Sequence, residues 1–198
     1  MIHRLNDFAT VQTGLVTARK KAQFDSLNHI KYEQIGLRCF TNSVKLDRLE
    51  TDMFVASVPL KDKYLTKEGD VLVRLRSPSS ALYIDKENEG LLISSLLAVI
   101  RTQNEGMNSK YLAYYINARK AQQFLQKDIK GTRISMLKTK DLEYLELVLP
   151  SLEEQEKLVK YLDTAEEEQV FLASLAKEKQ KLSQEILNII IEQNKEKN

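Results

Sequence analysis

The chain has 198 residues and a mass of 22.8 kDa, which suits one large domain or one domain with an appendage and excludes a multidomain enzyme. Hydrophobic residues make up 42% and charged residues 29%, and Gly and Pro number only 6 + 3 = 9, which excludes disordered, collagen-like and low-complexity classes. One cysteine and two histidines exclude an intramolecular disulfide framework and a Cys/His zinc cluster.

No segment predicts a membrane span or a secretory leader. The longest apolar run, residues 91–100, is about half as long as a bilayer-spanning helix and ends at Arg101. Residues 1–15 alternate polar and apolar side chains and lack the basic-then-apolar layout of a signal peptide. We therefore expect a cytoplasmic protein with no membrane partner.

Charge divides the chain at Pro150. Residues 1–150 carry 23 Lys/Arg against 17 Asp/Glu, a net charge of +6, and residues 151–198 carry 7 against 11, a net charge of −4. A basic front part suits a polyanion such as nucleic acid, whereas an acidic rear part more plausibly meets protein. An excess of +6 also occurs in ordinary domains, so charge alone does not decide.

The front part predicts a mixed sheet with one packed helix. Turn-forming Gly and Pro residues separate short β-branched or apolar runs, which are typical of strands. A helical pattern follows, with Gly131 as its stop, and a last alternating strand ends at Pro150. The predicted strands are residues 53–58, 70–75, 81–84, 91–100 and 144–149, and the predicted helix is residues 108–129.

A long helix is predicted to begin after Pro150. Ser151 and Glu154 have the spacing of a capping box, and no Gly or Pro occurs between them and the C-terminus. At 1.5 Å per residue, a helix over 151–193 would be about 65 Å long. Apolar or small residues recur every three or four positions and form a seam: Leu158, Leu162, Ala165, Leu172, Leu175, Leu182, Ile186 and Ile189.

This seam favours a partner helix, because a lone helix of this length would expose its leucines to water. The repeat is not a clean heptad, since a three-residue step follows Leu172 and would locally overwind a coiled coil. The alternative is an amphipathic helix that breaks near residues 166–168 and folds back on its own domain. The predicted fold class is α+β: a target-binding domain over residues 1–150 and one long coiled-coil helix over residues 151–198.

Enzyme motifs are absent from the sequence. It contains no GxGxxG, GxxxxGK[ST], HExxH or GxSxG pattern and no amino-methyltransferase box. Asp70, followed by Arg74 and Arg76, weakly suggests a nuclease site, but a metal-dependent nuclease needs a second carboxylate nearby. The favoured interpretation is that Asp70 stabilises a turn before a strand. Cys39 is expected to be a small buried side chain rather than a nucleophile.

Three loops combine cations with hydroxyl groups, which is the chemistry that reads or clamps DNA. They are residues 17–21, 74–80 and 130–135, the last followed by Lys138 and Lys140. Arginine can bond a guanine edge twice or hold a phosphate, and serine can do either more weakly. Any one of these loops could equally be a solvated basic loop.

The sequence resembles the specificity subunits of type I restriction-modification systems. The resemblance rests on Gly69-Asp70 before a strand, on the helix opening at Asn108, on Gly131-Thr132-Arg133, and on residues 149–155, which match the family's "P-L/S-x-E-Q" entry into its spacer helix. It covers nearly the whole chain. The element at residues 149–155 is fairly specific, and the Gly69-Asp70 element alone is weak.

The resemblance implies a non-catalytic subunit that binds double-stranded DNA. A full-length family member has two recognition domains and two long helices, whereas this chain has one of each, so two copies would restore the arrangement as a homodimer reading a bipartite site. Methyltransferase and restriction subunits are the implied partners. S-adenosylmethionine and ATP with magnesium are expected there, and no cofactor or metal is expected in this chain. The expected DNA contacts are Arg19, Lys20, Arg74, Arg76, Ser77, Ser79, Lys130, Thr132, Arg133, Lys138 and Lys140.

A different hypothesis fits the same pattern of charges. The chain could be a coiled-coil interaction scaffold, or a decoy subunit whose front domain has no DNA specificity of its own. Steep salt dependence of DNA binding would distinguish a DNA-recognition subunit from a scaffold, because phosphate contacts release counterions.

Overall fold

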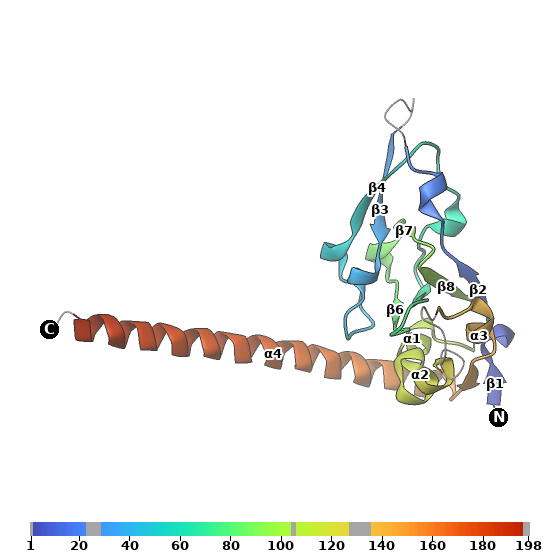
Figure 1. Cartoon of the computed structure of the whole chain (residues 1–198). Coiled ribbons are helices and arrows are strands. Elements are labelled where there is room, and N and C mark those ends of the chain that lie inside the picture. Colours follow the sequence, from blue (N-terminus) through green and yellow to red (C-terminus); the bar gives the residue numbers. More distant parts are fainter. Residues whose placement is uncertain (1, 23–28, 104–105, 127–135, 196–198) are drawn as a thin grey trace. The chain divides into compact units, whose positions relative to one another are not determined.

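The computed structural model describes residues 2–22, 29–103, 106–126 and 136–195, with side chains as far as residue 193 (Figure 1). The chain divides into two compact units, Met1–Lys157 and Leu158–Asn198. We call Met1–Lys157 the head. The division falls inside the last helix, so residues 151–157 group with the head.

Strands of the head form three sheets within the described residues. The four-stranded sheet is antiparallel throughout, and the three-stranded sheet joins one antiparallel and one parallel pair. The four-stranded sheet has the spatial order β2 (Ala9–Thr13), β8 (Leu97–Thr102), β5 (Val71–Arg74) and β6 (Ala81–Tyr83). The three-stranded sheet has the order β4 (Asp52–Ala56), β3 (Ile30–Ile35) and β7 (Leu92–Ile93). The two-stranded sheet pairs β1 (Ile2–Arg4) with β9 (Glu146–Val148).

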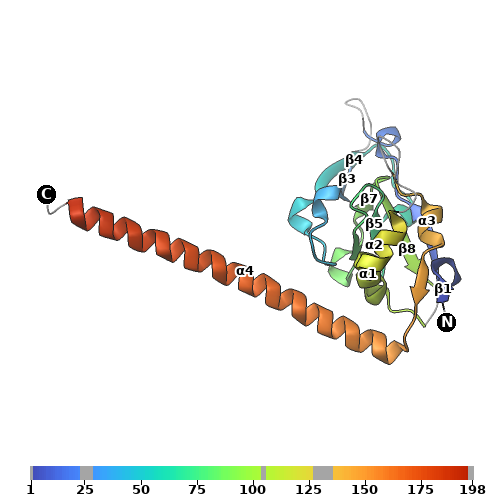
Figure 2. The same cartoon turned by 60° about the horizontal axis from the view of Figure 1, so that its bottom comes forward.

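Helices complete the head, and α1 packs against β5 and β6 (Figure 2). The described α-helices are α1 (Ser109–Asn117), α2 (Arg119–Leu125), α3 (Thr139–Glu143) and α4 (Leu152–Lys195). In the connections that the structure describes lie six short 3-10 turns: η1 (Leu5–Asp7), η2 (Thr17–Arg19), η3 (Leu37–Cys39), η4 (Arg48–Glu50), η5 (Asp62–Tyr64) and η6 (Lys86–Asn88). The α+β class with a long terminal helix is confirmed.

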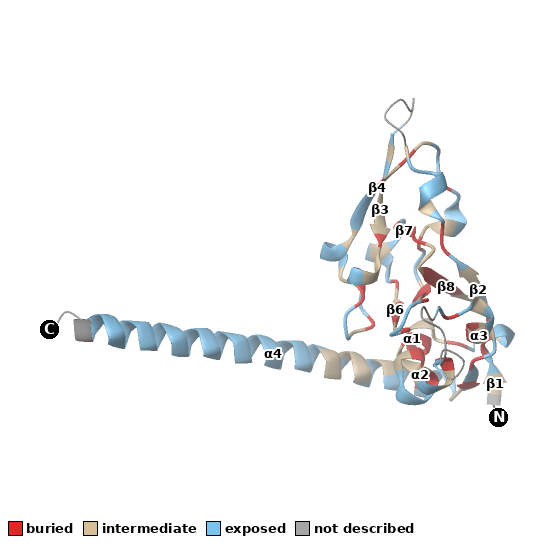
Figure 3. Cartoon of the chain, in the orientation of Figure 1, coloured by how far each residue is buried: buried red, intermediate tan, exposed pale blue. Residues whose placement is uncertain are grey.

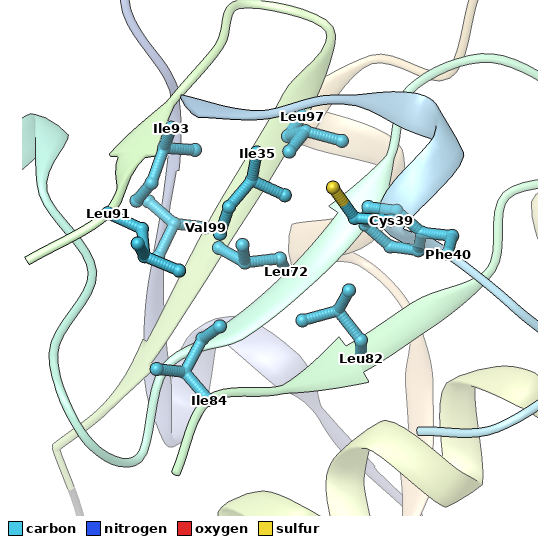
Figure 4. Close-up of a cluster of buried hydrophobic side chains, with 10 residues drawn as sticks. All are labelled: Ile35, Cys39, Phe40, Leu72, Leu82, Ile84, Leu91, Ile93, Leu97 and Val99. Atoms are coloured by element: carbon cyan, nitrogen blue, oxygen red, sulfur yellow. The ribbon is translucent and has the colours of Figure 1, made fainter. Parts of the chain in front are cut away.

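The main core lies between the two larger sheets. Leu72, Leu82 and Val99 of the four-stranded sheet meet Ile35 and Ile93 of the three-stranded sheet, and all five are fully buried (Figure 4). Burying such side chains stabilises the head by about 1.5–3 kcal/mol each. Because β5 and β6 belong to this core, the loop that joins them starts from a rigid base.

One predicted strand, residues 91–100, is two strands in the structure. β7 pairs with β3 and β8 pairs with β2 and β5, so the run passes from one sheet to the other through residues 94–96. Gly14 lies against this crossing, since a Cβ at position 14 would stand 2.3 Å from the Ser94 carbonyl oxygen. Periodicity could not show the division, because both halves are apolar and buried.

The predicted helix over residues 108–129 is also divided. α1 ends at Asn117, and Ala118 is extended, with φ −65° and ψ 144°, before α2 begins. Residues 127–129 lie outside the described part. Sequence reasoning did not predict β1, β2, β3 or α3. The strands β5, β6 and β9 lie within predicted strands, and β4 overlaps the predicted strand at residues 53–58.

Asp70 stabilises a turn before β5, as the favoured interpretation expected. Its Oδ2 accepts the Lys67 backbone N–H at 3.0 Å, and Gly69 in the same turn has φ +87°. Both carboxylate oxygens also accept hydrogen bonds from Arg101, Oδ1 from Nε at 2.9 Å and Oδ2 from Nη2 at 3.0 Å. The Asp70 side chain is only 3% exposed, so the ion pair is held inside the head.

α4 begins with the predicted capping box. Ser151 Oγ accepts the Glu154 backbone N–H at 3.3 Å, and the Glu154 carboxylate accepts the Ser151 backbone N–H at 2.9 Å. The hydrogen bonds from Ser151 lower the pKa of Glu154, so its carboxylate stays charged to a lower pH than that of an ordinary glutamate.

Gln155 anchors the start of α4 in the head. Its side chain is fully buried, and its Oε1 accepts the backbone N–H of Asn108 at 2.9 Å. Its Nε2 donates to the carbonyl oxygens of Gly106, at 3.0 Å, and Pro150, at 2.9 Å. Asn108 is the N-cap of α1, so one glutamine joins the beginnings of two helices. This explains why the head extends past Pro150.

We expect Asp70→Asn to lower the free energy of unfolding of the chain by about 3 kcal/mol, because it leaves the Arg101 guanidinium without its carboxylate in a largely buried site. Urea denaturation followed by circular dichroism measures this change. Asp62→Asn, at an exposed aspartate, is the matched control and should change stability little. Equal stabilities for the two variants would contradict the structural role of Asp70.

Candidate functional site

The basic loop at residues 74–80 begins beside Met136 and Leu137. The backbone N–H of Leu137 donates to the Leu75 carbonyl oxygen at 2.8 Å, and Arg76 forms an isolated antiparallel bridge with Met136. The segment that follows β5 therefore runs beside Met136 and Leu137, the residues that follow the predicted loop at 130–135. Lys130, Thr132 and Arg133 of that loop lie outside the described residues.

Arg74, at the end of β5, lies at the centre of this region. Its guanidinium carbon is 5.9 Å from the centroid of the Phe40 ring, a cation–π distance. Its Nε is buried, and among the described residues it has no hydrogen-bond acceptor. Buried donors are almost always paired in folded proteins, so this unpaired nitrogen is exceptional. Because Nε itself is buried, the guanidinium can meet a ligand in the hollow only through its Nη groups.

The Arg74 side chain lines a surface hollow of about 490 Å³. Apart from Arg74, the side chains around it are neutral, and most carry an amide or a hydroxyl group. The described residues that line the hollow are Phe40, Thr41, Asn42, Arg74, Pro78, Ser80, Asn117 and Gln122. One guanidinium surrounded by neutral hydrogen-bonding groups is suited to a planar polar ligand that offers acceptors.

Two side-chain amides hold the wall of this hollow. Asn117 Oδ1 accepts the Ala81 backbone N–H at 2.7 Å, and its Nδ2 donates to the Ala81 carbonyl oxygen at 2.8 Å. Gln122 Nε2 donates to the carbonyl oxygens of Ser79, at 2.9 Å, and Ile116, at 2.8 Å. The break at Ala118 allows both amides to reach the loop, because a continuous helix would turn Gln122 away from it.

Sequence reasoning missed Phe40, Asn42, Asn117 and Gln122. The signal that was available is Asn117 itself, because asparagine is a weak helix former and is typical of helix ends. Nothing local indicates that Phe40 and Asn42, more than 30 residues upstream of Arg74, lie beside it.

Ser77 and Ser79, the two predicted contact serines of the 74–80 loop, differ in burial. Ser77 is exposed, whereas Ser79 is 1% exposed, and its Oγ has no hydrogen-bond partner among the described residues. A direct contact from Ser79 to a ligand would require the loop to open. We therefore leave Ser79 out of the contact set proposed below.

Arg76 in the loop after β5, Lys138 at the N-cap of α3 and Lys140 inside α3 are exposed cations. Lys138 follows Leu137, which is bonded to Leu75, and the Lys138 backbone N–H donates to Asp141 Oδ2 at 2.9 Å at the start of α3. Their ammonium and guanidinium groups face solvent, which is the usual condition of groups that contact phosphate.

The predicted loop at residues 17–21 lies elsewhere in the head. Arg19 and Lys20 are exposed in and after η2, and the Lys20 carbonyl oxygen accepts the Ser57 backbone N–H at 3.0 Å, beyond the end of β4. Figure 1 shows this blue turn at the opposite end of the head from α1 and α2. The structure therefore does not bring these two residues together with Arg74.

The structure can be compared with two further predictions, the burial of Cys39 and the absence of a membrane span. Cys39 is fully buried, its thiol donates to the Glu50 carbonyl oxygen at 3.2 Å, and burial raises its pKa, as expected of a packing residue rather than a nucleophile. In the described ranges, no helix is long and apolar enough to span a bilayer.

Apolar side chains of α4 are exposed over much of its length (Figure 3). In the predicted seam, Leu162 and Ala165 are half-buried, and the other members are at least 41% exposed. Further apolar side chains outside that seam are exposed as well: Tyr161, Val170, Phe171, Leu187, Ile190 and Ile191. Exposed apolar side chains in this number are typical of a helix with a protein partner.

Comparison with known proteins identifies a family model. A model described as the type I restriction modification DNA specificity domain matches residues 1–194. The HsdS subunit from Thermoanaerobacter tengcongensis is 25% identical, with a TM-score of 0.56 over 85% of this chain and 37% of that chain.

Two further solved structures share the fold. A chain from a study of the complex assembly and conformational transition of the type I R-M system is 22% identical, with a TM-score of 0.59 over 87% of this chain and 39% of that one. The type I restriction-modification S subunit from M. genitalium is 17% identical, with a TM-score of 0.54 over 88% and 41%. This chain thus spans about two fifths of the length of these structures.

We expect Gln122→Met to lower the free energy of unfolding by about 1–2 kcal/mol, because the Ser79 and Ile116 carbonyl oxygens lose their side-chain donor. Thermal or urea unfolding measures the loss. Gln123→Met changes the neighbouring, exposed glutamine in the same way and should have little effect. If the two variants are equally stable, the amide does not hold the loop.

Proposed function

This chain belongs to the type I restriction-modification DNA specificity family, and on that premise we propose that it is a sequence-specific DNA-recognition subunit of such a system. It binds double-stranded DNA and directs methyltransferase subunits to the site, and it performs no reaction itself. S-adenosylmethionine, and ATP with magnesium, act in the partner subunits.

The observation that carries this proposal is the Arg74 hollow. A guanidinium with a buried, unpaired nitrogen lies over an aromatic ring, among neutral amide and hydroxyl groups. Exposed Arg76 lies in the loop after β5, and exposed Lys138 follows Leu137, which is bonded to Leu75, with exposed Lys140 two residues further along the chain. Base-reading groups beside phosphate-binding groups form the two classes of contact that a sequence-specific DNA-binding protein needs. Lys130, Thr132 and Arg133 lie outside the described residues and are included in the proposed contact set on their sequence pattern alone.

A symmetric pair of chains is the second part of the proposal. The exposed apolar side chains of α4 would be removed from water by another copy of the same helix. Two heads would then read two identical half-sites in inverted orientation, with the helix pair setting the gap between them.

DNA affinity should fall steeply with salt, because each phosphate contact adds about 0.9 to the slope of log K against log salt concentration. In the complex with methyltransferase subunits, we expect the triple variant Arg76→Ala, Lys138→Ala and Lys140→Ala to lower that slope by about two to three. Fluorescence anisotropy across a salt series measures it.

Lys67→Ala, at an exposed lysine at the other end of β5, is the control for this experiment and should leave the slope unchanged. Absence of DNA binding by the unaltered complex would overturn the proposed function and leave the scaffold or decoy hypothesis.

Leu172→Asp combined with Leu182→Asp should convert a dimer into monomers, because each aspartate places a charge in the apolar seam. Light scattering measures the mass. Gln180→Asp with Gln184→Asp adds the same two charges at polar positions of the same segment and should leave the dimer intact. A monomeric unaltered chain, or an unchanged mass for the leucine variant, would contradict pairing through this seam.

A further inference from the structure

The cations near the β5–β6 loop fall into two environments. Arg76, Lys138 and Lys140 are exposed to solvent, whereas Arg74 is partly buried, with Phe40 against its guanidinium. An exposed cation can follow a phosphate by changing rotamer. A guanidinium held against a ring presents its donors in one plane and one direction, which is a condition for reading a base rather than a charge.

The surroundings of Arg74 also favour a base over a phosphate. In the described part of the chain, the hollow contains no second cation, and its other polar side chains are the neutral groups of Thr41, Asn42, Ser80, Asn117 and Gln122. Asn117 uses both ends of its amide on Ala81. Gln122 uses its Nε2 on two carbonyl oxygens, so its Oε1 is the end that can accept from a ligand.

Guanidinium chemistry selects among the bases. Arginine has five N–H donors and no acceptor. In the major groove, guanine presents two neighbouring acceptors, N7 and O6, which match two N–H groups of a guanidinium, whereas adenine presents one acceptor beside a donor. Because the Nε of Arg74 is buried, its two Nη groups are the pair of donors that a guanine edge in the hollow would meet.

We propose that Arg74 is a specificity-determining residue that reads one guanine of the target through its major-groove edge, with Phe40 holding the plane of the guanidinium. This inference rests on the proposed function and deepens it. Arg76, Lys138 and Lys140 bind the DNA backbone and do not choose the base.

Arg74→Lys is the sharpest test, because lysine keeps the charge but loses the planar fork. The complex with methyltransferase subunits is used to select binders from a pool of random double-stranded DNA, which are then sequenced. We expect the unaltered protein to select a motif containing a G·C pair whose discrimination falls about tenfold in Arg74→Lys, with the other positions kept.

Arg76→Ala is the matched control, two residues away and on the exposed side. It should keep the whole motif and bind all sequences more weakly. Arg74→Met, which keeps the packing over Phe40, serves as a second variant. It should lose the same base preference with an unfolding temperature close to that of the unaltered chain.

The outcomes separate the two proposals. If Arg74→Lys and Arg74→Met retain the full motif and only Arg74→Met loses overall affinity, Arg74 is a phosphate contact and this inference is wrong while the proposed function stands. A selected motif without any G·C pair would also overturn it. If the unaltered complex selects no motif, the proposed function itself fails.

Discussion

A pair of side-chain amides supports the region that we assign to DNA recognition. Asn117 closes two hydrogen bonds with the backbone of Ala81, and Gln122 holds the carbonyl oxygens of Ser79 and Ile116. Hydrogen bonds of this kind contribute about 1 kcal/mol each to stability, but their larger effect here is on geometry. They fix the loop after Arg74 to the end of α1, which packs on the sheet that contains Arg74 itself.

The same principle operates at the start of α1. Gln155 satisfies the Asn108 backbone N–H and the carbonyl oxygens of Gly106 and Pro150, and Asp70 is paired with Arg101. Buried polar groups with complete hydrogen bonding specify one arrangement, since any alternative would leave them unpaired in a low-dielectric interior. Against this background, the unpaired Nε of Arg74 stands out as a group whose acceptor is not in the described part of the chain.

The head and the C-terminal part of α4 have opposite physical requirements. The head buries its apolar side chains between its own sheets, so its surface is free to carry cations and hydrogen-bonding groups. Beyond the head, α4 leaves leucines and isoleucines exposed. So many exposed apolar side chains are typical of a surface that meets protein. Recognition and assembly are thus assigned to separate stretches of the chain.

The sequence alone predicted what depends on neighbouring residues. The capping box of Ser151 and Glu154, the turn at Asp70 and the long helix with its exposed seam each follow from local spacing, and the structure confirms them. Tertiary structure decided the rest. It divided residues 91–100 between two sheets, where the two halves pair with different strands, and it broke the helix at Ala118, next to the Asn117 side chain that bonds the Ala81 backbone. It also placed Phe40 against Arg74 across 34 residues, a contact that exists only once the sheets have packed and that no local pattern encodes.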